Sequence, residues 1–441
     1  MDSLETFSKR YLLDTYARNY THFVRGDGAK LYTNDGIDFI DFTAGIGVNA
    51  LGHNNPNLVE SISSQASKML HISNLFYIDS AVKLAQKMID LNAQDMRVFF
   101  CNSGLEANEC AIKIARIYGE RFLVESPFVT KGADSNDLRE KGGDSNGADS
   151  SDFRADSAVD SSDLAQKYKN HRYKIITLKN SFHGRSIATL KACGQSKMHT
   201  HFSPFPSGFI YAKDIDEAIK LASSDNAVVA IFLELIQGEG GIYAMPRDSV
   251  LRLEAFCKEN DILLMIDEVQ SGVFRSGEFL ASNYYGIKPN VITLAKGLAG
   301  GVPIGAVMCD KVDIFSPAQH GSTFGGNPLA MSAGMCVLQT LESYKKSGEL
   351  DATIKLFNER LEAIQGKFSD IVLGISGIGL MRGLKLKSDE FLNKIIAKAH
   401  EKRVLVLKSG GATLRFLPPL TITKDEVDEG FRRLESAISE I

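Results

Sequence analysis

Two charged residues stand at the ends of apolar segments that have the composition of β-strands. Asp267 directly follows the run Ile262–Ile266, and Lys296 comes two residues after Val291–Leu294. In open α/β sheets the carboxyl ends of the strands line the ligand crevice, so we expect both side chains to project into one site. A lysine buried among apolar residues has a depressed pKa and can act as an amine nucleophile.

The pairing of a lysine with an aspartate is typical of a pyridoxal phosphate site. In such a site the aspartate pairs with the pyridinium nitrogen and keeps it protonated, so that the ring stays an effective electron sink. The alternative is an ordinary ion pair between Asp267 and Lys296 at the edge of a sheet. These two residues alone leave both interpretations open.

A candidate phosphate site follows the predicted strand Arg97–Cys101. Ser103 and the residues after it open a predicted helix, where free backbone N–H groups and the helix dipole attract anions. Plain N-capping by Ser103, with Glu106 at the capping-box position, fits the same residues equally well. Further along, Phe182 and Arg185 follow another predicted strand and would supply an aromatic face and a cation, although a phenylalanine such as Phe182, taken alone, is more often a core residue.

Apolar, β-branched runs alternate with segments of helical periodicity through the middle of the chain. This alternation predicts an α/β fold with a mostly parallel sheet that is covered by helices on both faces. The predicted strands are Arg97–Cys101, Tyr173–Leu178, Val228–Leu233, Ile262–Ile266, Val291–Leu294 and Ile304–Met308. The predicted helices include Glu106–Tyr118, Asp214–Ala222 and Ser249–Glu259.

The two ends of the chain differ from this middle, and together they predict a small α+β domain. Short strands are predicted in the tail at Ile371–Gly374, Val404–Leu407 and Thr413–Phe416. We therefore expect residues 1–56 to form the N-terminal part of the small domain and 57–326 the large domain that binds the cofactor. Residues 327–441 would form a linker helix, predicted at Pro328–Tyr344, and the C-terminal part of the small domain. Residues 129–167 are rich in Asp, Ser and Gly and are too polar to form a core, which predicts a surface insertion.

Composition excludes several classes of protein. The 441 residues are 44% hydrophobic and 24% charged, which is typical of a folded globular protein. The formal net charge of −4 gives no electrostatic reason to expect nucleic acid or an anionic membrane as a partner. The apolar runs are too short to span a bilayer, and the first ten residues lack the apolar core of a signal peptide. The six cysteines form no CxxC pair and the nine histidines show no metal-ligand spacing, so we expect no metal and a cytoplasmic location.

Six motifs appear in an order that matches one family of enzymes. They are NSGLEANECAIK, SFHGRS, ELIQGEGG, IDEVQSGVFRSG, TLAKGLAGGVPIGA and GSTFGGNPLA. Together they resemble the class III, fold-type-I aminotransferases that depend on pyridoxal 5'-phosphate, from about Tyr16 to the C-terminal helix. The resemblance implies the fold-type-I architecture, the cofactor and transaminase activity. Leu105, Leu235, Phe274 and Asn55 depart from the usual pattern, but none of them removes a group that does covalent chemistry.

Carried over position by position, the resemblance makes Lys296 the Schiff-base lysine and Asp267 the partner of the pyridinium nitrogen. It implies that the other contacts to the ring and the phosphate come from Ser103, Gly104, the Leu105 amide, Phe182, His183, Val269 and Gln270. Thr323 would reach the phosphate from the neighbouring subunit, which implies a homodimer with shared active sites.

The resemblance also implies four substrate-binding residues. The enzyme would bind two substrates in turn, and one of them, 2-oxoglutarate, presents two carboxylates that bidentate arginines suit. Arg185, helped by Tyr16, would bind the distal carboxylate, and Arg415 would bind the α-carboxylate of 2-oxoglutarate. Glu239 would pair with Arg415 while the amino donor is bound. Surface arginines and a turn glutamate are the alternative for these residues.

Residues 41–53 and 71–77 resemble the branch of the family that uses N-acetylornithine as the amino donor. Enzymes for free ornithine usually carry tyrosine where this chain has Ile46, and the loss of that hydroxyl leaves room for an acyl group. We expect transfer of the distal amino group of N-acetylornithine to 2-oxoglutarate, giving N-acetylglutamate semialdehyde and glutamate in arginine biosynthesis. Succinylated donors are close analogues. The alternatives are an ornithine or 4-aminobutyrate aminotransferase and, more remotely, a non-catalytic regulatory homologue that binds the cofactor.

Overall fold

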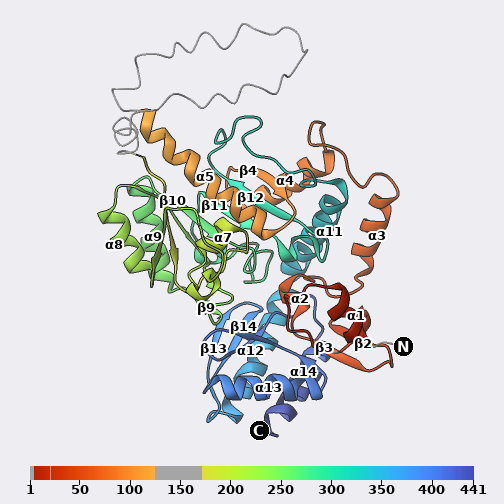
Figure 1. The fold of residues 1–441 in the computed structure, drawn as a ribbon. Helices are drawn as coiled ribbons and strands as arrows, with labels where there is room; N and C mark the ends of the chain where they lie inside the picture. Colours follow the sequence, from red (N-terminus) through yellow and green to blue (C-terminus); the bar gives the residue numbers. More distant parts are fainter. Residues whose placement is uncertain (1–3, 20, 125–170) are drawn as a thin grey trace.

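The computed structural model describes residues 4–19, 21–124 and 171–441 (Figure 1). Its central element is a seven-stranded sheet with the order β4-β12-β11-β10-β7-β5-β6. The strands are β4 (Arg97–Cys101), β5 (Lys174–Leu178), β6 (Phe209–Ala212), β7 (Val228–Leu233), β10 (Leu263–Asp267), β11 (Val291–Leu294) and β12 (Gly305–Cys309). Only β12 runs against its neighbours, so the predicted α/β class with a mostly parallel sheet is confirmed. The insertion predicted at 129–167 lies outside the described residues.

Helices cover both faces of this sheet because successive residues of a strand point to opposite sides. Phe232 and Met265 pack on one face with α5, while Ile231 and Leu264 pack on the other face with α8 and α9. These helices are α5 (Gly104–Val124), α8 (Ile215–Ser224) and α9 (Arg247–Glu259). All six residues of β7 are buried, as expected for a strand between two helical layers.

A second group of helices packs against β4, β11 and β12. These helices are α3 (Pro56–Ala66), α4 (Asp79–Asn92) and α11 (Pro328–Ser347). At the beginning of α11 the Asn327 side chain accepts a hydrogen bond from the Ala330 N–H (2.9 Å), and Pro328 occupies the first turn, where a missing N–H is harmless. The long helix predicted from Pro328 is therefore confirmed, and it continues to Ser347.

The two ends of the chain meet in a separate lobe, where the red N-terminal elements lie beside the blue C-terminal ones in Figure 1. One sheet, β1-β2-β3-β15, contains strands from both ends because β3 pairs in parallel with β15. Four phenylalanines pack together here, with ring centroids 4.8 to 6.2 Å apart: Phe42, Phe357, Phe416 and Phe431. The domain boundaries predicted at residues 56 and 326 stay predictions.

The elements of this lobe are β1 (Phe23–Asp27), β2 (Lys30–Thr33), β3 (Asp38–Asp41), α12 (Glu349–Lys367), β13 (Val372–Ile378), β14 (Met381–Leu386), α13 (Asp389–Glu401), β15 (Val404–Leu405), β16 (Leu407–Ser409), β17 (Thr413–Phe416) and α14 (Lys424–Ile438). The remaining short elements are α1 (Leu4–Tyr11), α2 (Ala44–Gly47), α7 (Ile187–Ala192), β8 (Ile236–Gln237), β9 (Tyr243–Ala244), α10 (Ala281–Tyr285) and two 3₁₀ turns, η1 (Ser196–His199) and η2 (Lys296–Ala299). Among the described helices, none combines the length and the apolar character that crossing a bilayer requires.

Candidate active site

A cavity of about 430 Å³ opens at one edge of the central sheet. Five parallel strands (β4, β5, β7, β10 and β11) end at this edge, and each is followed within a few residues by side chains that line the cavity. The lining residues are Val48, Asn102, Ser103, Gly104, Leu105, Asn108, Phe182, His183, Gly184, Arg185, Glu234, Glu239, Asp267, Val269, Gln270, Ala295, Lys296, Gly301, Val302, Pro303 and Ile304. The expectation that Asp267 and Lys296 face one site is therefore met.

Lys296 begins η2, just past the end of β11. Its backbone has a left-handed conformation (φ +43°), which is uncommon outside glycine and is a form of strain found at functional sites. Burial lowers the pKa of Lys296, and the charge of Asp267 only partly opposes this effect. A lowered pKa increases the fraction of neutral amine, which is the nucleophilic form.

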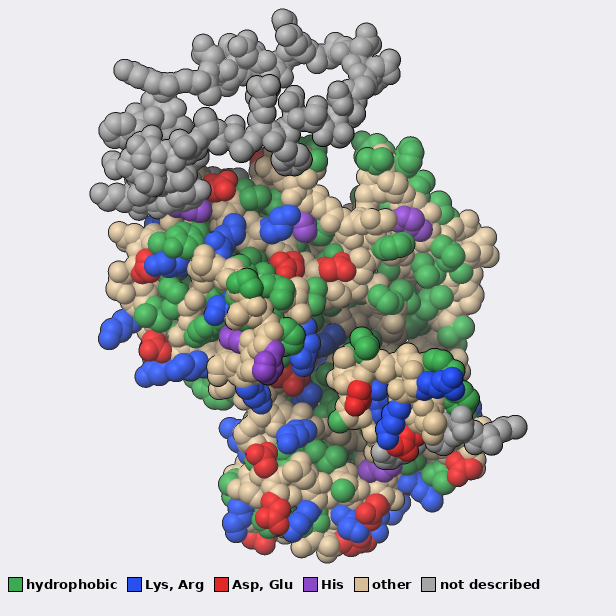
Figure 2. Space-filling view, viewed as in Figure 1, with side chains coloured by type: hydrophobic (Ala, Val, Ile, Leu, Met, Phe, Trp, Pro, Cys, Tyr) green, Lys and Arg blue, Asp and Glu red, His purple; other side chains and the backbone are tan. Residues whose placement is uncertain are grey.

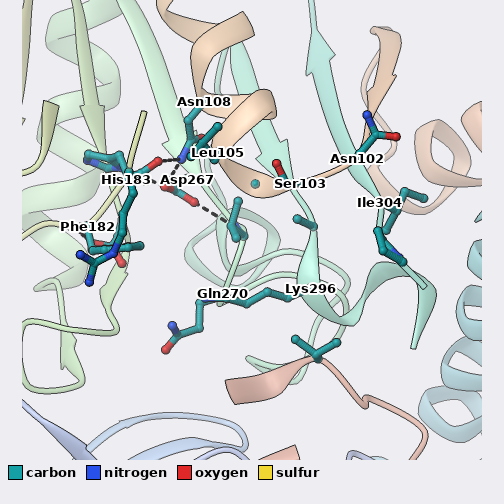
Figure 3. A pocket seen from close by; sticks show the side chains of 18 of the residues that line it. Asn102, Ser103, Leu105, Asn108, Phe182, His183, Asp267, Gln270, Lys296 and Ile304 are labelled. Atoms are coloured by element: carbon teal, nitrogen blue, oxygen red, sulfur yellow. Dashed lines mark hydrogen bonds and ion pairs between the residues drawn. The ribbon is translucent and has the colours of Figure 1, made fainter. Parts of the chain in front are cut away.

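Asp267 is the last residue of β10 and is held by its neighbours in a fixed orientation (Figure 3). Its Oδ2 lies 2.8 Å from His183 Nδ1 and accepts a hydrogen bond from Asn108 Nδ2 at 2.8 Å, and its Oδ1 accepts one from the Val269 N–H at 3.0 Å. Asn108 also donates to the His183 carbonyl (2.7 Å). Among the described residues, no ion pair joins Asp267 to Lys296. The alternative interpretation, an ordinary ion pair between these two residues, is therefore not observed.

Ser103 and Gly104 lie where α5 begins. In Figure 3, Ser103 lies to the right of His183 and Asp267. Ser103 Oγ accepts a hydrogen bond from the Glu106 N–H (3.2 Å), so the predicted N-cap is present. The hydroxyl keeps its own proton, which it can donate to a phosphate oxygen, so the two interpretations of Ser103 are compatible. A Cβ on Gly104 would come within 2.6 Å of Val269 Cγ1, which shows that Val269 packs directly against the start of the helix.

The loop after β5 carries Phe182, His183 and Arg185. His183 is buried and stacks on Phe232, with ring centroids 4.2 Å apart and an interplanar angle of 20°. The Arg185 guanidinium lies over the Phe182 ring at 5.7 Å from its centroid. Both side chains line the cavity, so this loop offers an aromatic face and a cation to a bound molecule.

Arg415, on β17, is nearly fully buried and is connected to the cavity by its contact with Glu239. Its Nη1 donates to Glu239 Oε1 at 2.5 Å and lies 3.4 Å from the Gly238 carbonyl oxygen. Glu239 lines the cavity. A buried guanidinium is thus covered by a carboxylate that can be exchanged for a carboxylate of a ligand.

Besides Arg415, two residues with predicted contacts, Tyr16 and Thr323, do not line the cavity, and neither does Ile46. Tyr16 is 71% exposed, Thr323 is exposed, and Ile46 is exposed beside Val48, which does line the cavity. The segment that carries Thr323 is joined to the phosphate side by the Asn102 Nδ2 to Ser322 Oγ hydrogen bond (3.1 Å). The roles predicted for Tyr16 and Thr323 stay predictions.

Two polar residues of the site were missed in the sequence. Glu234 directly follows the fully apolar strand β7, the same signal that identified Asp267, and burial raises the pKa of Glu234 to about 7. Asn108 lies within a helix, where a single asparagine gives no signal of its own. The cavity also contains Gln270 Oε1, a buried atom without a hydrogen-bond partner in the described part of the chain. Such an atom matches a ligand that carries a hydroxyl donor, as the ring of pyridoxal phosphate does.

The fold and this site define the class of protein. The chain matches the aminotransferase class-III family over residues 15–438, and it therefore belongs to that family. It is 47% identical over 437 residues to the acetylornithine aminotransferase of Wolinella succinogenes, a similarity that covers 99% of this chain and 100% of that one. Among solved structures it is similar to the ornithine aminotransferase of Toxoplasma gondii (TM-score 0.82, 28% identity, 99% and 94% covered), crystallised with partial occupancy of PLP at the active site. It is also similar to the N-acetylornithine aminotransferase of Stenotrophomonas maltophilia (TM-score 0.74, 30% identity, 99% and 99% covered).

Proposed function

We propose that this chain is a pyridoxal-phosphate-dependent acetylornithine aminotransferase of arginine biosynthesis. It transfers the distal amino group of N-acetylornithine to 2-oxoglutarate and yields N-acetylglutamate semialdehyde and glutamate. The observation that carries the proposal is the convergence of Lys296, Asp267 and the Glu239–Arg415 pair on one cavity. The near-full-length similarity to an acetylornithine aminotransferase at 47% identity supports the choice of donor.

The chain's own residues divide the work of the reaction. When bound, pyridoxal phosphate supplies an electron sink for the electrons released as a proton leaves the substrate carbon that bears nitrogen. Lys296 Nζ holds the cofactor and then moves that proton. Asp267, oriented by His183 and Asn108, holds the proton on the ring nitrogen. Phe182, Val269, His183 and Gln270 would hold the cofactor ring, and Ser103, Gly104 and the Leu105 amide would hold its phosphate.

Two arginines account for the two substrates. Arg185, with Tyr16, binds the distal carboxylate, and Arg415 binds the α-carboxylate of 2-oxoglutarate. While the amino donor is bound, Glu239 covers Arg415 and keeps an unpaired cation away from the donor's distal amine. When 2-oxoglutarate enters, Glu239 moves off and the guanidinium forms a bidentate pair with the carboxylate.

A homodimer with shared active sites and a cytoplasmic location complete the proposal. Large apolar side chains are exposed before and within α4 and in the loop after β12: Met69, Leu70, Leu75, Phe76, Tyr77, Val82 and Phe324. Figure 2 shows hydrophobic side chains gathered on the upper right of the face that it draws. A second copy that covers them would bring Thr323 to the partner's phosphate site.

Mixed dimers test this arrangement. Subunits with Lys296→Ala and subunits with Thr323→Ala are each expected to have little activity. If Thr323 acts across the interface, a mixed dimer keeps one site with both an intact lysine and an intact partner threonine, so activity returns on mixing. A lack of recovery in verified mixed dimers would contradict the shared site.

A panel of amino donors tests the reaction itself. With 2-oxoglutarate as acceptor, kcat/KM is measured for N-acetylornithine, N-succinylornithine, ornithine and 4-aminobutyrate. We expect the two acylated donors to be preferred. A higher kcat/KM for ornithine would favour the alternative suggested by the structural similarity to the Toxoplasma gondii enzyme. Bound cofactor without turnover of any donor would favour a non-catalytic homologue.

A further inference from the structure

Glu234 is a buried carboxylate that has no part in the proposed chemistry, although it lies on the cavity wall. Its two oxygens bind two different loops. Oε2 accepts a hydrogen bond from the Phe182 N–H (3.0 Å), and Oε1 accepts one from the Gly238 N–H (3.2 Å). The first N–H belongs to Phe182 itself, and the second belongs to the residue before Glu239. A bound molecule would meet the side chains of both Phe182 and Glu239.

The backbone of Gly238 is held on both sides of its Cα. Its N–H donates to Glu234, while its carbonyl oxygen accepts a hydrogen bond from Ser409 Oγ (2.7 Å) and lies 3.4 Å from Arg415 Nη1. Glu239 is the next residue, so the position of this peptide determines where the Glu239 carboxylate starts from when it reaches Arg415. A Cβ on Gly238 would lie 2.3 Å from Gln270 Oε1, so a larger residue at this position would have to push the end of the Gln270 side chain aside.

We propose that Glu234 is a positioning residue that fixes the Gly238 peptide so that Glu239 rests on Arg415, and that it thereby controls how readily a dicarboxylate displaces Glu239. This inference rests on the roles given to Glu239 and Arg415 in the proposed function. With the peptide fixed, the Glu239 carboxylate meets the guanidinium without first losing conformational freedom. When the Gly238 backbone is loosened, Glu239 has to lose conformational freedom each time it pairs with Arg415. The Glu239–Arg415 pair is then weaker, and a competing carboxylate binds Arg415 more tightly.

Glu268 provides a matched control for a purely structural role. It is also a buried carboxylate just past a strand of the central sheet, and it accepts hydrogen bonds from the Ser271 hydroxyl (2.6 Å) and from the backbone N–H groups of Ala281 (3.0 Å) and Ser282 (2.7 Å). It does not line the cavity. A substitution at Glu268 therefore perturbs a buried carboxylate of the same kind without touching the Gly238 peptide.

The experiment measures binding of glutarate, a dicarboxylate without an amino or keto group, to the holoenzyme by isothermal titration calorimetry. Glu239→Gln is expected to tighten glutarate binding about tenfold, because it removes a charged competitor for Arg415. Glu234→Gln keeps the shape of the side chain but has a single acceptor oxygen, whereas the N–H groups of Phe182 and Gly238 each need an acceptor. Because the Gly238 backbone is then held less firmly, we expect glutarate binding to tighten about threefold to tenfold. The double variant should bind glutarate as Glu239→Gln does, because Glu234 acts through Glu239. Glu268→Gln should stay within about twofold of the unmodified protein.

Ser409→Ala gives an independent arm, since it releases the Gly238 carbonyl from the other side and should tighten glutarate binding in the same direction. It also serves if Glu234→Gln does not fold, which thermal unfolding of each variant reveals. Unchanged glutarate affinity in Glu234→Gln and Ser409→Ala, beside a clear effect of Glu239→Gln, would overturn the inference and leave the proposed function intact. A double variant whose change in glutarate affinity equals the product of the two single fold-changes would also overturn it, because Glu234 and Glu239 would then act independently. No effect of Glu239→Gln itself would overturn both the inference and the roles given to Glu239 and Arg415.

Discussion

Replacement of Glu239 by glutamine is expected to change which substrates the site accepts. The Arg415 side chain is 4% exposed and that of Glu239 is 34% exposed, and the two meet at 2.5 Å. A hydrogen bond to a charged group contributes about 1.5–3 kcal/mol, and the partial exposure of Glu239 favours the lower end of that range. A change of about 1.5–2 kcal/mol corresponds to about 10- to 30-fold in a rate or affinity.

The two half-reactions report this change separately. Single-turnover measurements follow the cofactor absorbance after mixing the holoenzyme with N-acetylornithine or with glutamate. In Glu239→Gln the guanidinium of Arg415 is always available, so glutamate is expected to react faster through its α-carboxylate. N-acetylornithine is expected to react more slowly, because its distal amine meets an uncovered cation. Equal losses in both half-reactions, or no change in either, would refute the exchange of carboxylates at Arg415, and Glu268→Gln is the control for general damage.

Four further outcomes are expected. Lys296→Ala should abolish transamination while thermal unfolding changes little, and normal turnover would contradict its assignment. Asn108→Ala removes one of the two side chains that orient Asp267 and, if Asp267 has the proposed role, should lower kcat about tenfold in steady-state assays. Deletion of residues 132–165 should leave kcat and cofactor binding within a few-fold, because their composition cannot form a core. Hydrogen bonding from Arg432 lowers the pKa of Glu429 to about 2. Denaturant titrations compare the free energy of unfolding of Glu429→Gln with that of the unmodified protein. The difference should have its full size above about pH 4.5 and should vanish as the pH falls towards 2.

Much of the central sheet could be predicted because its strands are buried on both faces and therefore form continuous apolar runs. The rule that charged residues at the ends of such runs meet in a crevice brought Asp267 and Lys296 together correctly. The same rule applies to Glu234, which directly follows β7. Val228–Leu233 and Val291–Leu294, in which every residue is buried, were predicted to the residue for this reason. Arg97–Cys101 was also predicted to the residue, although only its last two residues are buried.

Other features were beyond the sequence pattern because they depend on contacts between distant residues. The Arg415–Glu239 pair joins positions 176 residues apart, and only the family resemblance suggested it. The orientation of Asp267 by Asn108 joins positions 159 residues apart and follows from the packing of α5 over the sheet. Strand β6 was missed because it has only four residues, three of them only partly buried, at the edge of the sheet.

Pairing of β3 with β15 restricts the order in which the chain can fold. Strand β3 ends at Asp41, and its parallel partner begins only at Val404, so this pairing has to wait until almost the whole chain has left the ribosome. Until then β3 has an unpaired edge, and Phe42 lacks the aromatic partners that bury it. Val48, which lines the cavity, and Arg415, which pairs with Glu239 on the cavity wall, both belong to these late-assembling segments. All seven strands of the central sheet, and with them Asp267 and Lys296, precede β17, so a nascent chain that stops short of β17 contains both of these residues but lacks Arg415, to which we assign the second substrate.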